Sequence, residues 1–279
     1  YILFRELAPF MSGLPELSAL RQILIDASEK AGLSSFGLRE TKAKVDGSVV
    51  TEIDHEMQRI ISTELKSGWP EFSFMGEEMD HDEQARIVHA GQDHGFWALD
   101  PLDGTTNFAM GFPFYGVSLA LVKNGEPKLG VVYDPVRREC FSASAGGGAY
   151  LDGVPLKTPQ APLALRECVA NVDYKRLVSG LADSLVRYPP YRSQRNLGSS
   201  VLEWCWVAAG RVQLYLHGGQ RMWDYAAGSL ILKEAGGVFS TIPGNVLDCR
   251  KLTKRSAIAA ITPELHRLWI GWVRENENP

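Results

Sequence analysis

Apolar residues recur at helical spacing in two segments near the start of the chain. In residues 15–31 they fall on one face of a helix, with Pro15 near its beginning and Gly32 as a signal for its end. After residues 49–53 the same spacing returns at Met57, Ile60, Ile61 and Leu65. The pattern predicts two amphipathic helices, each with its apolar face turned towards a hydrophobic core.

Shorter apolar runs separated by turn residues dominate the middle of the chain. The strand-like segments are residues 72–75, 96–99, 116–122, 128–133, 139–143 and 150–151. A strong hairpin signal stands at residues 123–126, and Asp152-Gly153 marks a further turn. This succession predicts an antiparallel meander. Residues 81–95 are polar without a clear period, and we expect a surface excursion there.

Beyond a proline-rich stretch at residues 156–162, strand-like and helix-like segments alternate. Strands are expected at 167–172, 211–216, 238–241 and 256–260, and helices at 175–185, 198–209, 224–235 and 263–273. Such alternation is typical of a layered α/β arrangement. The sequence thus predicts an N-terminal α+β lobe over residues 1–155 and a C-terminal α/β lobe over residues 156–279.

The segment that offers the most chemistry is residues 96–108. Its apolar run enters Asp100-Pro101, where proline removes a backbone donor and should end the strand. Asp103-Gly104 is typical of a turn, and residues 105–107 can begin a helix. Carboxylates suit a hard cation such as Mg²⁺, and the free N–H groups at a helix start suit a phosphate. In isolation, however, two aspartates at this spacing are more often ordinary turn and cap residues.

Four motifs give the chain a resemblance to the inositol monophosphatase family of Mg²⁺-dependent, Li⁺-sensitive phosphatases. Residues 100–108 follow the family pattern D-P-L/I-D-G-T-T/S-N-F, residues 223–228 follow W-D-x-A-A-G, residues 76–78 follow G-E-E, and residues 50–54 follow V-T-x-x-D. The motifs stand in the family's order, and the resemblance extends from the first helix onward. It implies the family's layered αβαβα sandwich, in which the two lobes share one active-site cleft.

The resemblance also implies a set of metal ligands, supported by Glu78. They are Glu77, Asp100, the backbone carbonyl of Leu102, Asp103 and Asp224. Carboxylates that converge in this way would repel one another, and about two or three Mg²⁺ ions per site would relieve that repulsion. Taken alone, Asp224 is also explained as the cap of the helix that follows it.

Hydrolysis in this family uses a metal-activated water, so we expect no covalent phosphoenzyme. The resemblance implies that Thr105 and Glu77 orient the water and take its proton. Backbone N–H groups at Gly104, Thr105 and Thr106 are the expected contacts to the phosphate oxygens.

Two further features are implied to complete the site. Asp54 is a catalytic candidate that supports the metals or binds a third ion, although a helix N-cap would also explain it. The polar loop at residues 39–48 resembles a mobile family loop whose lysine helps to hold that third ion. Lys42 and Lys44 are the candidates, and a solvated basic loop explains either lysine equally well.

Substrate choice is where the chain departs from the family pattern. Inositol-specific members carry a glutamate seven positions before the aspartate of W-D-x-A-A-G, and here that position is His217. A neutral histidine can still bind hydroxyl groups, but the charged acceptor is gone, and a variable loop with a chance histidine explains the change equally well. Candidate substrate contacts are Asp103, Gly104, Thr105, Thr106, Ser199, Ser200 and His217.

The leading expectation is therefore an inositol-1-monophosphatase. The alternatives are a 3′(2′),5′-bisphosphate nucleotidase or a histidinol-phosphate phosphatase of the same superfamily. Outside the enzymes, a regulatory or binding protein on the same fold is a further alternative, since function depends on the site and not on the fold.

Composition narrows this picture further. With 33 acidic against 29 basic residues, the formal net charge of −4 argues against generic nucleic-acid binding. No apolar run approaches the roughly 20 residues of a membrane span, and the first residues lack signal-peptide character. Four widely spaced cysteines predict reduced, mostly buried thiols. We expect a cytoplasmic enzyme with a small phosphorylated substrate, and the resemblance adds a homodimer.

Overall fold

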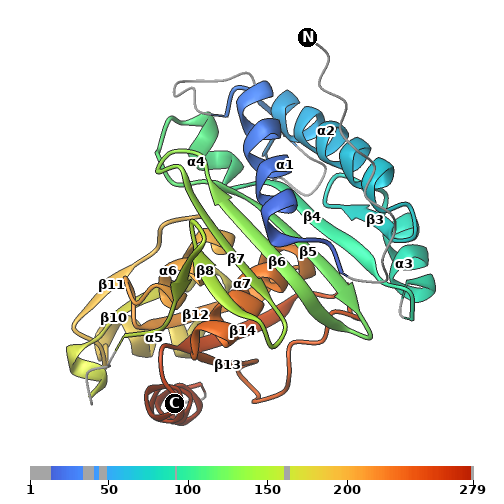
Figure 1. Ribbon diagram of the computed structural model, residues 1–279. Coiled ribbons are helices and arrows are strands. Elements are labelled where there is room, and N and C mark those ends of the chain that lie inside the picture. The colour runs from blue at the N-terminus through green and yellow to red at the C-terminus, as the bar shows by residue number, and fades with distance from the viewer. Residues whose placement is uncertain (1–13, 34–40, 44–48, 92, 160–163, 278–279) are drawn as a thin grey trace.

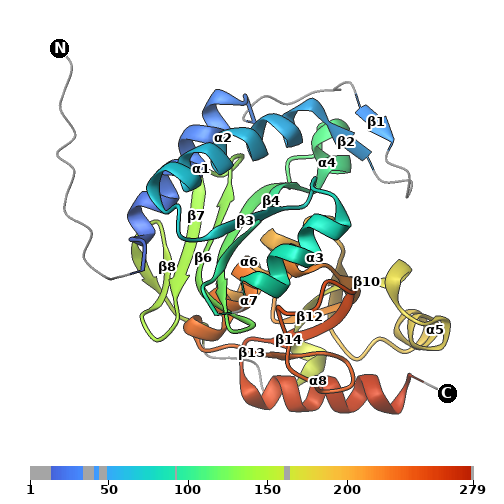
Figure 2. The same cartoon turned by 90° about the vertical axis from the view of Figure 1, so that its right-hand side faces the viewer.

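Two sheets and three sets of helices alternate through the molecule (Figure 1). The computed structural model describes residues 14–33, 41–43, 49–91, 93–159 and 164–277. Helices α1 and α2 cover one face of a seven-stranded sheet, and α6 and α7 lie between it and a five-stranded sheet. Helix α8 covers the outer face of the second sheet, as Figure 2 shows from the side. The predicted layered αβαβα sandwich is confirmed.

Strands β3 to β9 form the seven-stranded sheet in chain order. Their bounds are Ser73–Gly76, Phe96–Asp103, Gly116–Lys123, Glu126–Asp134, Glu139–Ser144, Gly148–Leu151 and Val154–Leu156. Strand β3 runs parallel to β4, and every later pair of neighbours is antiparallel. The predicted meander is therefore confirmed, with tight turns at Gly125 and Gly153 that both have positive φ.

The five-stranded sheet has the order β11-β10-β12-β14-β13. The bounds of β10 to β14 are Val169–Asp173, Ser193–Arg195, Leu214–Gln220, Val238–Ser240 and Arg255–Ala260. Strand β10 runs parallel to β11 and β12, and this register places Asp173 directly opposite His217. Two polar residues that are distant in the sequence therefore lie side by side on neighbouring strands. Strands β1 (Thr41–Ala43) and β2 (Val49–Thr51) form a separate antiparallel pair.

The helices bury the faces that their periodicity predicts. Helices α1 to α8 span Leu17–Lys30, Glu52–Gly68, His81–Ala90, Thr105–Ala109, Ser179–Arg187, Ser200–Ala208, Met222–Ala235 and Pro263–Glu275. The apolar stripes of α1 and α2 are buried, which confirms both predicted helices. Helix α7 is buried around most of its circumference because it contacts both sheets. Among the described residues, no helix is long and apolar enough to cross a bilayer.

Three local predictions are wrong. The supposed surface excursion contains α3, whose start is capped by the Asp80 side chain. The strand expected to stop at Asp100-Pro101 continues to Asp103. Its pairing with β5 is irregular there, so the backbone N–H that proline lacks is not needed for a hydrogen bond. The helix expected from residue 175 is preceded by a 3₁₀ turn, Tyr174–Arg176, and α5 begins only at Ser179.

Two hydrophobic clusters fill the layers. The larger joins α6 and α7 to both sheets, and the smaller lies under α1 and α2. All four cysteines are free and buried, with Cys140 in the smaller cluster and Cys168, Cys205 and Cys249 in the larger. Burial raises the thiol pKa of Cys140 and Cys249 to about 12 and that of Cys168 to about 11. The lobe boundary at residues 155 and 156 stays a prediction.

Candidate active site

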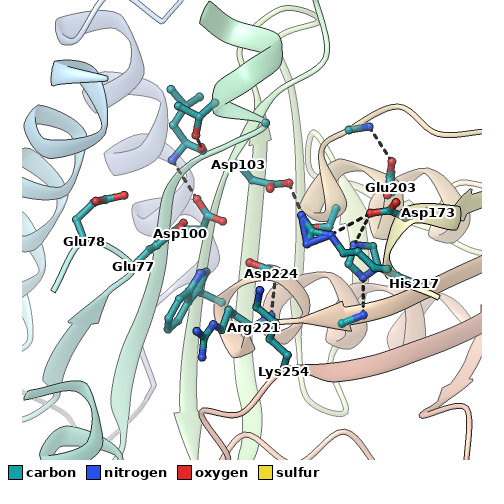
Figure 3. Close-up of a pocket in the computed structure, with 18 of the residues that line it drawn as sticks. Glu77, Glu78, Asp100, Asp103, Asp173, Glu203, His217, Arg221, Asp224 and Lys254 are labelled. Carbon is teal, nitrogen blue, oxygen red and sulfur yellow. Dashed lines mark hydrogen bonds and ion pairs between the residues drawn. The ribbon is translucent and has the colours of Figure 1, made fainter. Parts of the chain in front are cut away.

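One pocket of about 490 Å³ brings together most of the residues singled out in the sequence (Figure 3). It lies at the end of β4, beside the starts of α4, α6 and α7. The predicted residues that line it are Glu77, Glu78, Asp100, Leu102, Asp103, Gly104, Thr105, Ser200, His217 and Asp224. Its size is that of an ordinary small-molecule site.

Three of the predicted residues whose side chains are described, Thr106, Asp54 and Ser199, do not line this pocket. Thr106 is exposed beyond it, and Asp54 is buried in α2, where its charge still acts on Asp100. Ser199 is fully buried under the pocket wall. Lys44 lies outside the described residues, and only the backbone of Lys42, in β1, is described.

The irregular end of β4 places two aspartates at the pocket. Asp100 is 1% exposed, and its Oδ1 accepts the N–H of Leu102 at 3.2 Å. Asp103 follows three positions later, and the chain then turns through Gly104 at a left-handed φ of 85° into α4. A side chain at this glycine would lie 3.0 Å from the Phe114 carbonyl oxygen. Both the left-handed backbone conformation and this close contact therefore favour glycine.

Asp103 is anchored to the start of α6. Its Oδ2 accepts the Ser199 hydroxyl at 2.7 Å, the Val201 N–H at 2.9 Å and the Ser200 hydroxyl at 3.4 Å. Burial raises the pKa of Asp103, and these hydrogen bonds offset part of that rise. Ser199 therefore supports this carboxylate from below, whereas Ser200 reaches the pocket itself.

Asp224 stands in the first turn of α7. Its Oδ2 accepts the N–H of Arg221 at 2.8 Å, and its Oδ1 has no donor among the described residues. Burial raises the pKa of Asp224 well above its usual range, and the charges of Asp103 and Glu77 raise it further. The pKa of Asp100 is raised in the same way by burial, then by Glu77, Asp103, Asp224 and Asp54. We call Glu77, Asp100, Asp103 and Asp224 the acidic end of the pocket.

The chemistry of the acidic end fits a hard divalent cation. Its donors are carboxylate oxygens from β4, from α7 and from the turn after β3, and the raised pKa values of the three aspartates reflect a shortage of positive charge. Within the described residues, no three of the aspartate, glutamate, histidine and cysteine side chains stand close enough to form a ready-made metal cluster. The carboxylates surround the pocket without meeting, which leaves room for a cation between them.

Glu77 is held beside β4 by two elements. Its N–H donates to the Leu99 carbonyl at 3.1 Å, which extends the parallel pairing of β3 with β4. From α3, the buried Gln84 side chain donates to the carbonyls of Gly76 at 2.9 Å and Glu77 at 3.2 Å. The helix that the sequence pattern did not predict therefore fixes a residue of the site.

Thr105 lies where β4 gives way to α4. Its hydroxyl donates to the Leu102 carbonyl at 3.0 Å, so two of the predicted site residues are joined directly. The hydroxyl oxygen can still accept a hydrogen bond from a water in the pocket.

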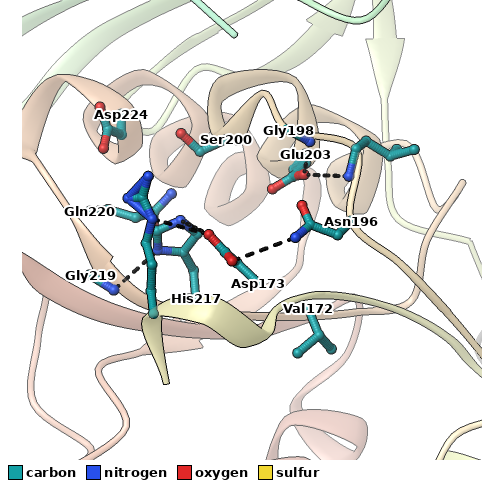
Figure 4. A network of polar contacts seen from close by, with 12 residues as sticks. Val172, Asp173, Asn196, Gly198, Ser200, Glu203, His217, Gly219, Gln220 and Asp224 are labelled. Carbon is teal, nitrogen blue, oxygen red and sulfur yellow. Dashed lines mark hydrogen bonds and ion pairs between the residues drawn. The ribbon is translucent and has the colours of Figure 1, made fainter. Parts of the chain in front are cut away.

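The far end of the pocket has a different character (Figure 4). His217 Nδ1 accepts the Gly219 N–H at 3.1 Å, so the ring proton is on Nε2, which lies 3.4 Å from Asp173 Oδ2. Burial, together with the nearby charges of Arg176, Lys175 and Lys254, lowers the pKa of His217 to about 3. We call Lys175, Arg176 and Lys254, with Asp173 and His217, the basic end.

Glu203 also reaches the pocket, from α6. Its Oε1 accepts the N–H groups of Leu197 at 3.1 Å and Gly198 at 3.0 Å, and burial raises its pKa to about 7. The sequence reasoning missed Glu203, Asp173, Arg176 and Lys254. Asp173 had a usable signal, because it directly follows a predicted strand, as His217 does.

Comparison with known proteins agrees with this geometry. The model of the inositol monophosphatase family matches residues 16–277. Inositol monophosphatase 1 from Solanum lycopersicum is 35% identical over 261 residues, which cover 89% of this chain and 92% of that protein. Nus factor SuhB from Vibrio cholerae is 31% identical over 272 residues, which cover 92% of this chain and 96% of that protein.

Among solved structures, Thermotoga maritima IMPase has a TM-score of 0.79 and 30% identity, over 93% of this chain and 96% of that one. The family match spans nearly the whole described chain, and three of the four motifs contribute residues that line the pocket. The chain belongs to the inositol monophosphatase family of phosphoric monoester hydrolases.

Proposed function

We propose that this protein is a Mg²⁺-dependent phosphatase of small phosphate monoesters, with inositol 1-phosphate as the leading substrate. The observation that carries the proposal is the acidic end of the pocket, where Asp100 is buried, Asp224 is half-buried and both have raised pKa values. Such a site favours a bound divalent cation over a purely structural role. Asp100, Asp103, Asp224, Glu77 and the Leu102 carbonyl would hold about two or three ions.

The chain's own groups then have distinct roles. A bound Mg²⁺ supplies positive charge that acidifies a water and balances the phosphate oxygens. Glu77 takes the proton of the attacking water, and Thr105 orients that water through its hydroxyl oxygen. The backbone N–H groups of Gly104 and Thr105, which line the pocket at the start of α4, bind phosphate oxygens.

Other residues predicted from the sequence belong to the same proposal. Asp54, 2% exposed in α2, supports the ligands or holds a further ion, and its charge already raises the pKa of Asp100. Lys42 or Lys44 would help to hold that ion from the neighbouring loop. Ser199 acts on substrate only through Asp103, to which its hydroxyl donates.

Removal and return of the metal tests this function. Excess chelator should abolish hydrolysis of inositol 1-phosphate, and Mg²⁺ should restore it, while Li⁺ should inhibit the restored activity. Full hydrolysis in excess chelator would contradict the metal requirement. Activity that is indifferent to Li⁺ would remove only the narrower claim of lithium sensitivity.

A regulatory protein on the same fold is the second candidate. Its specific support is the similarity to a protein named Nus factor SuhB. Against it stands the complete acidic end with Thr105, which a protein without turnover is free to lose. If Asp100→Asn abolishes hydrolysis and leaves the cellular role intact, the regulatory function is the correct one.

The family resemblance also supports a homodimer, and we further propose that it works in the cytoplasm and binds neither nucleic acid nor membrane. Sedimentation of the purified protein tests the first part, since a single monomeric species at working concentration would contradict it.

A further inference from the structure

Three cations at the basic end have unused hydrogen-bonding capacity. Lys175, Arg176 and Lys254 line the same pocket as the acidic end. Within the described part of the chain, neither lysine ammonium group has an acceptor, and Arg176 uses only its Nε, at 3.1 Å from Asp173 Oδ2. A basic stretch on a surface is usually solvated, but these three side chains face a cavity that already contains a candidate phosphate site.

Arg176 is held in place by a buried anchor. Asp173 is 6% exposed, and its Oδ2 is shared between Arg176 Nε and His217 Nε2–H, the second at 3.4 Å. Its Oδ1 lies 3.5 Å from Asn196 Nδ2. Because His217 is neutral and buried, it orients Asp173 without neutralising it, and Asp173 in turn orients the guanidinium. The two terminal amino groups of Arg176 remain available as a planar pair of donors.

The backbone of β12 is shaped to admit this arrangement. The pairing of β12 with β14 is irregular between His217 and Gln220, where the chain reads Gly218-Gly219. A side chain at Gly218 would overlap the Arg176 carbonyl, and Gly219 lies against the stem of Lys254. Gly218 therefore lets the Tyr174–Arg176 turn approach β12 closely, whereas a side chain at Gly219 would meet Lys254 only at ordinary contact distance.

The charge balance at this end is positive. Three cations stand against the carboxylate of Asp173, while His217 is neutral. Glu203, whose pKa burial raises to about 7, carries only part of a negative charge near neutral pH. The acidic end requires cations, whereas the basic end offers positive charge to a ligand.

We propose that the basic end is an anion subsite for the leaving group, so that the preferred substrate is a phosphate ester that carries a second anionic group. A second phosphate matches the fork of Arg176 best, and a carboxylate is the other source of the same chemistry. This inference rests on the proposed phosphatase function of the same pocket. Inositol 1-phosphate remains a slower substrate, and an ester with a cationic leaving group is disfavoured.

Matched substrate pairs test the subsite in the Mg²⁺-loaded protein. One pair is fructose 1,6-bisphosphate with fructose 1-phosphate, and the other is 2-phosphoglycerate with glycerol 2-phosphate. We expect kcat/KM to be at least about tenfold higher for the more anionic member of the first pair, and to be higher by a smaller factor in the second pair. Histidinol phosphate should have the lowest kcat/KM. Equal values within both pairs would overturn the proposal.

Variants locate the effect. Arg176→Ala should reduce the preference for the bisphosphate by roughly 10- to 100-fold, with the monophosphate changed less than about twofold. Arg176→Lys and Asp173→Asn should each keep part of the preference, and Lys254→Ala should lose part of it. Lys251→Ala is the matched control, because Lys251 is exposed near Lys254 and does not line the pocket. An equal fall for both esters in Arg176→Ala would show a merely structural role.

A binding measurement separates this inference from the proposed function. Fructose 6-phosphate retains the second phosphate and needs no hydrolysis, so its affinity is measured by calorimetry in wild type and Arg176→Ala. If no ester is hydrolysed but the variant binds fructose 6-phosphate at least about tenfold more weakly, the subsite stands and the phosphatase function fails. Unchanged affinity would overturn the subsite, and circular dichroism of each variant confirms its fold.

Discussion

The two ends of the pocket both bury carboxylates, but they balance the negative charge differently. At the acidic end, Asp100, Asp103 and Asp224 form no ion pair within the described residues, and burial raises the pKa of each. At the basic end, Asp173 is just as buried, but Arg176 lies 3.1 Å away. In the proposed function, one end takes a cation from solution, and the other supplies its own.

This difference is what a metal-assisted phosphatase with a selective leaving-group site requires. A fixed arginine among Asp100, Asp103 and Asp224 would relieve their repulsion, but it would also compete with the catalytic cation. At the basic end no metal is needed, so a fixed guanidinium can meet the substrate directly. The comparison predicts opposite responses of the two ends to the same chemical change.

The largest effect is expected from Asp100→Asn. Loss of this ligand should lower kcat/KM by roughly 10³-fold or more, because several kcal/mol of transition-state charge stabilisation depend on the bound metal. In chelator, the variant should melt at a higher temperature than wild type, since a buried charge without a partner is gone. Asp173→Asn should not raise the melting temperature, because it leaves Arg176 without its partner. A fall in kcat/KM below about tenfold for Asp100→Asn would break the comparison.

The pH dependence of stability should separate metal-free from metal-loaded protein. The folded-state pKa values of Asp100 and Asp224 lie above the ordinary 3.8, so the folded state binds more protons than the unfolded state above that pH. The free energy of unfolding in chelator should therefore fall as the pH rises from about 4 towards neutrality. Bound Mg²⁺ favours the charged forms and should flatten this slope.

Melting temperatures between about pH 5 and pH 8, with chelator or with Mg²⁺, measure the difference. Glu203 contributes a second decline, between its ordinary 4.5 and its raised pKa of about 7, that metal does not remove directly. Glu203→Gln is therefore the control that isolates the aspartates. Equal slopes with and without metal would contradict the cation requirement of the acidic end.

The smallest effect distinguishes two neighbouring serines. Ser199 donates to Asp103 Oδ2 at 2.7 Å from a fully buried position, whereas Ser200 does so at 3.4 Å. Ser199→Ala should lower kcat/KM by roughly tenfold, because a hydrogen bond to a charged group is lost, and Ser200→Ala by less than about threefold. A larger loss for Ser200→Ala would mean that its hydroxyl contacts the substrate.

Local patterns were sufficient for most of the fold. The amphipathic spacing of α1 and α2 and the turn residues of the meander depend on neighbours in sequence, so their elements were predicted correctly. Pro101 was misleading, because a strand can carry proline where its pairing is irregular. Helix α3 was missed because its exposed face is polar, although Asp80 already marked its start.

The residues of the site likewise divide into those that short motifs predict and those that only the fold brings together. Asp100, Asp103 and Asp224 belong to short motifs, and the pocket contains all three. Asp173 belongs to no motif, and its contact with His217 exists only because β10 pairs with β12 across 44 positions. The sequence also could not indicate that both ring nitrogens of His217 have partners, which makes its proposed effect on substrate indirect.

The buried thiols can report how often different parts of the structure open. An alkylating reagent attacks the thiolate, and burial disfavours that form at every cysteine in the fold. Modification must therefore wait until the surrounding structure transiently opens. The alkylation rate of Cys140 reports how often the outer helices separate from their sheet. The rates of Cys168, Cys205 and Cys249 report how often the central layer opens. A comparison of these alkylation rates would reveal whether the two hydrophobic clusters open together or independently.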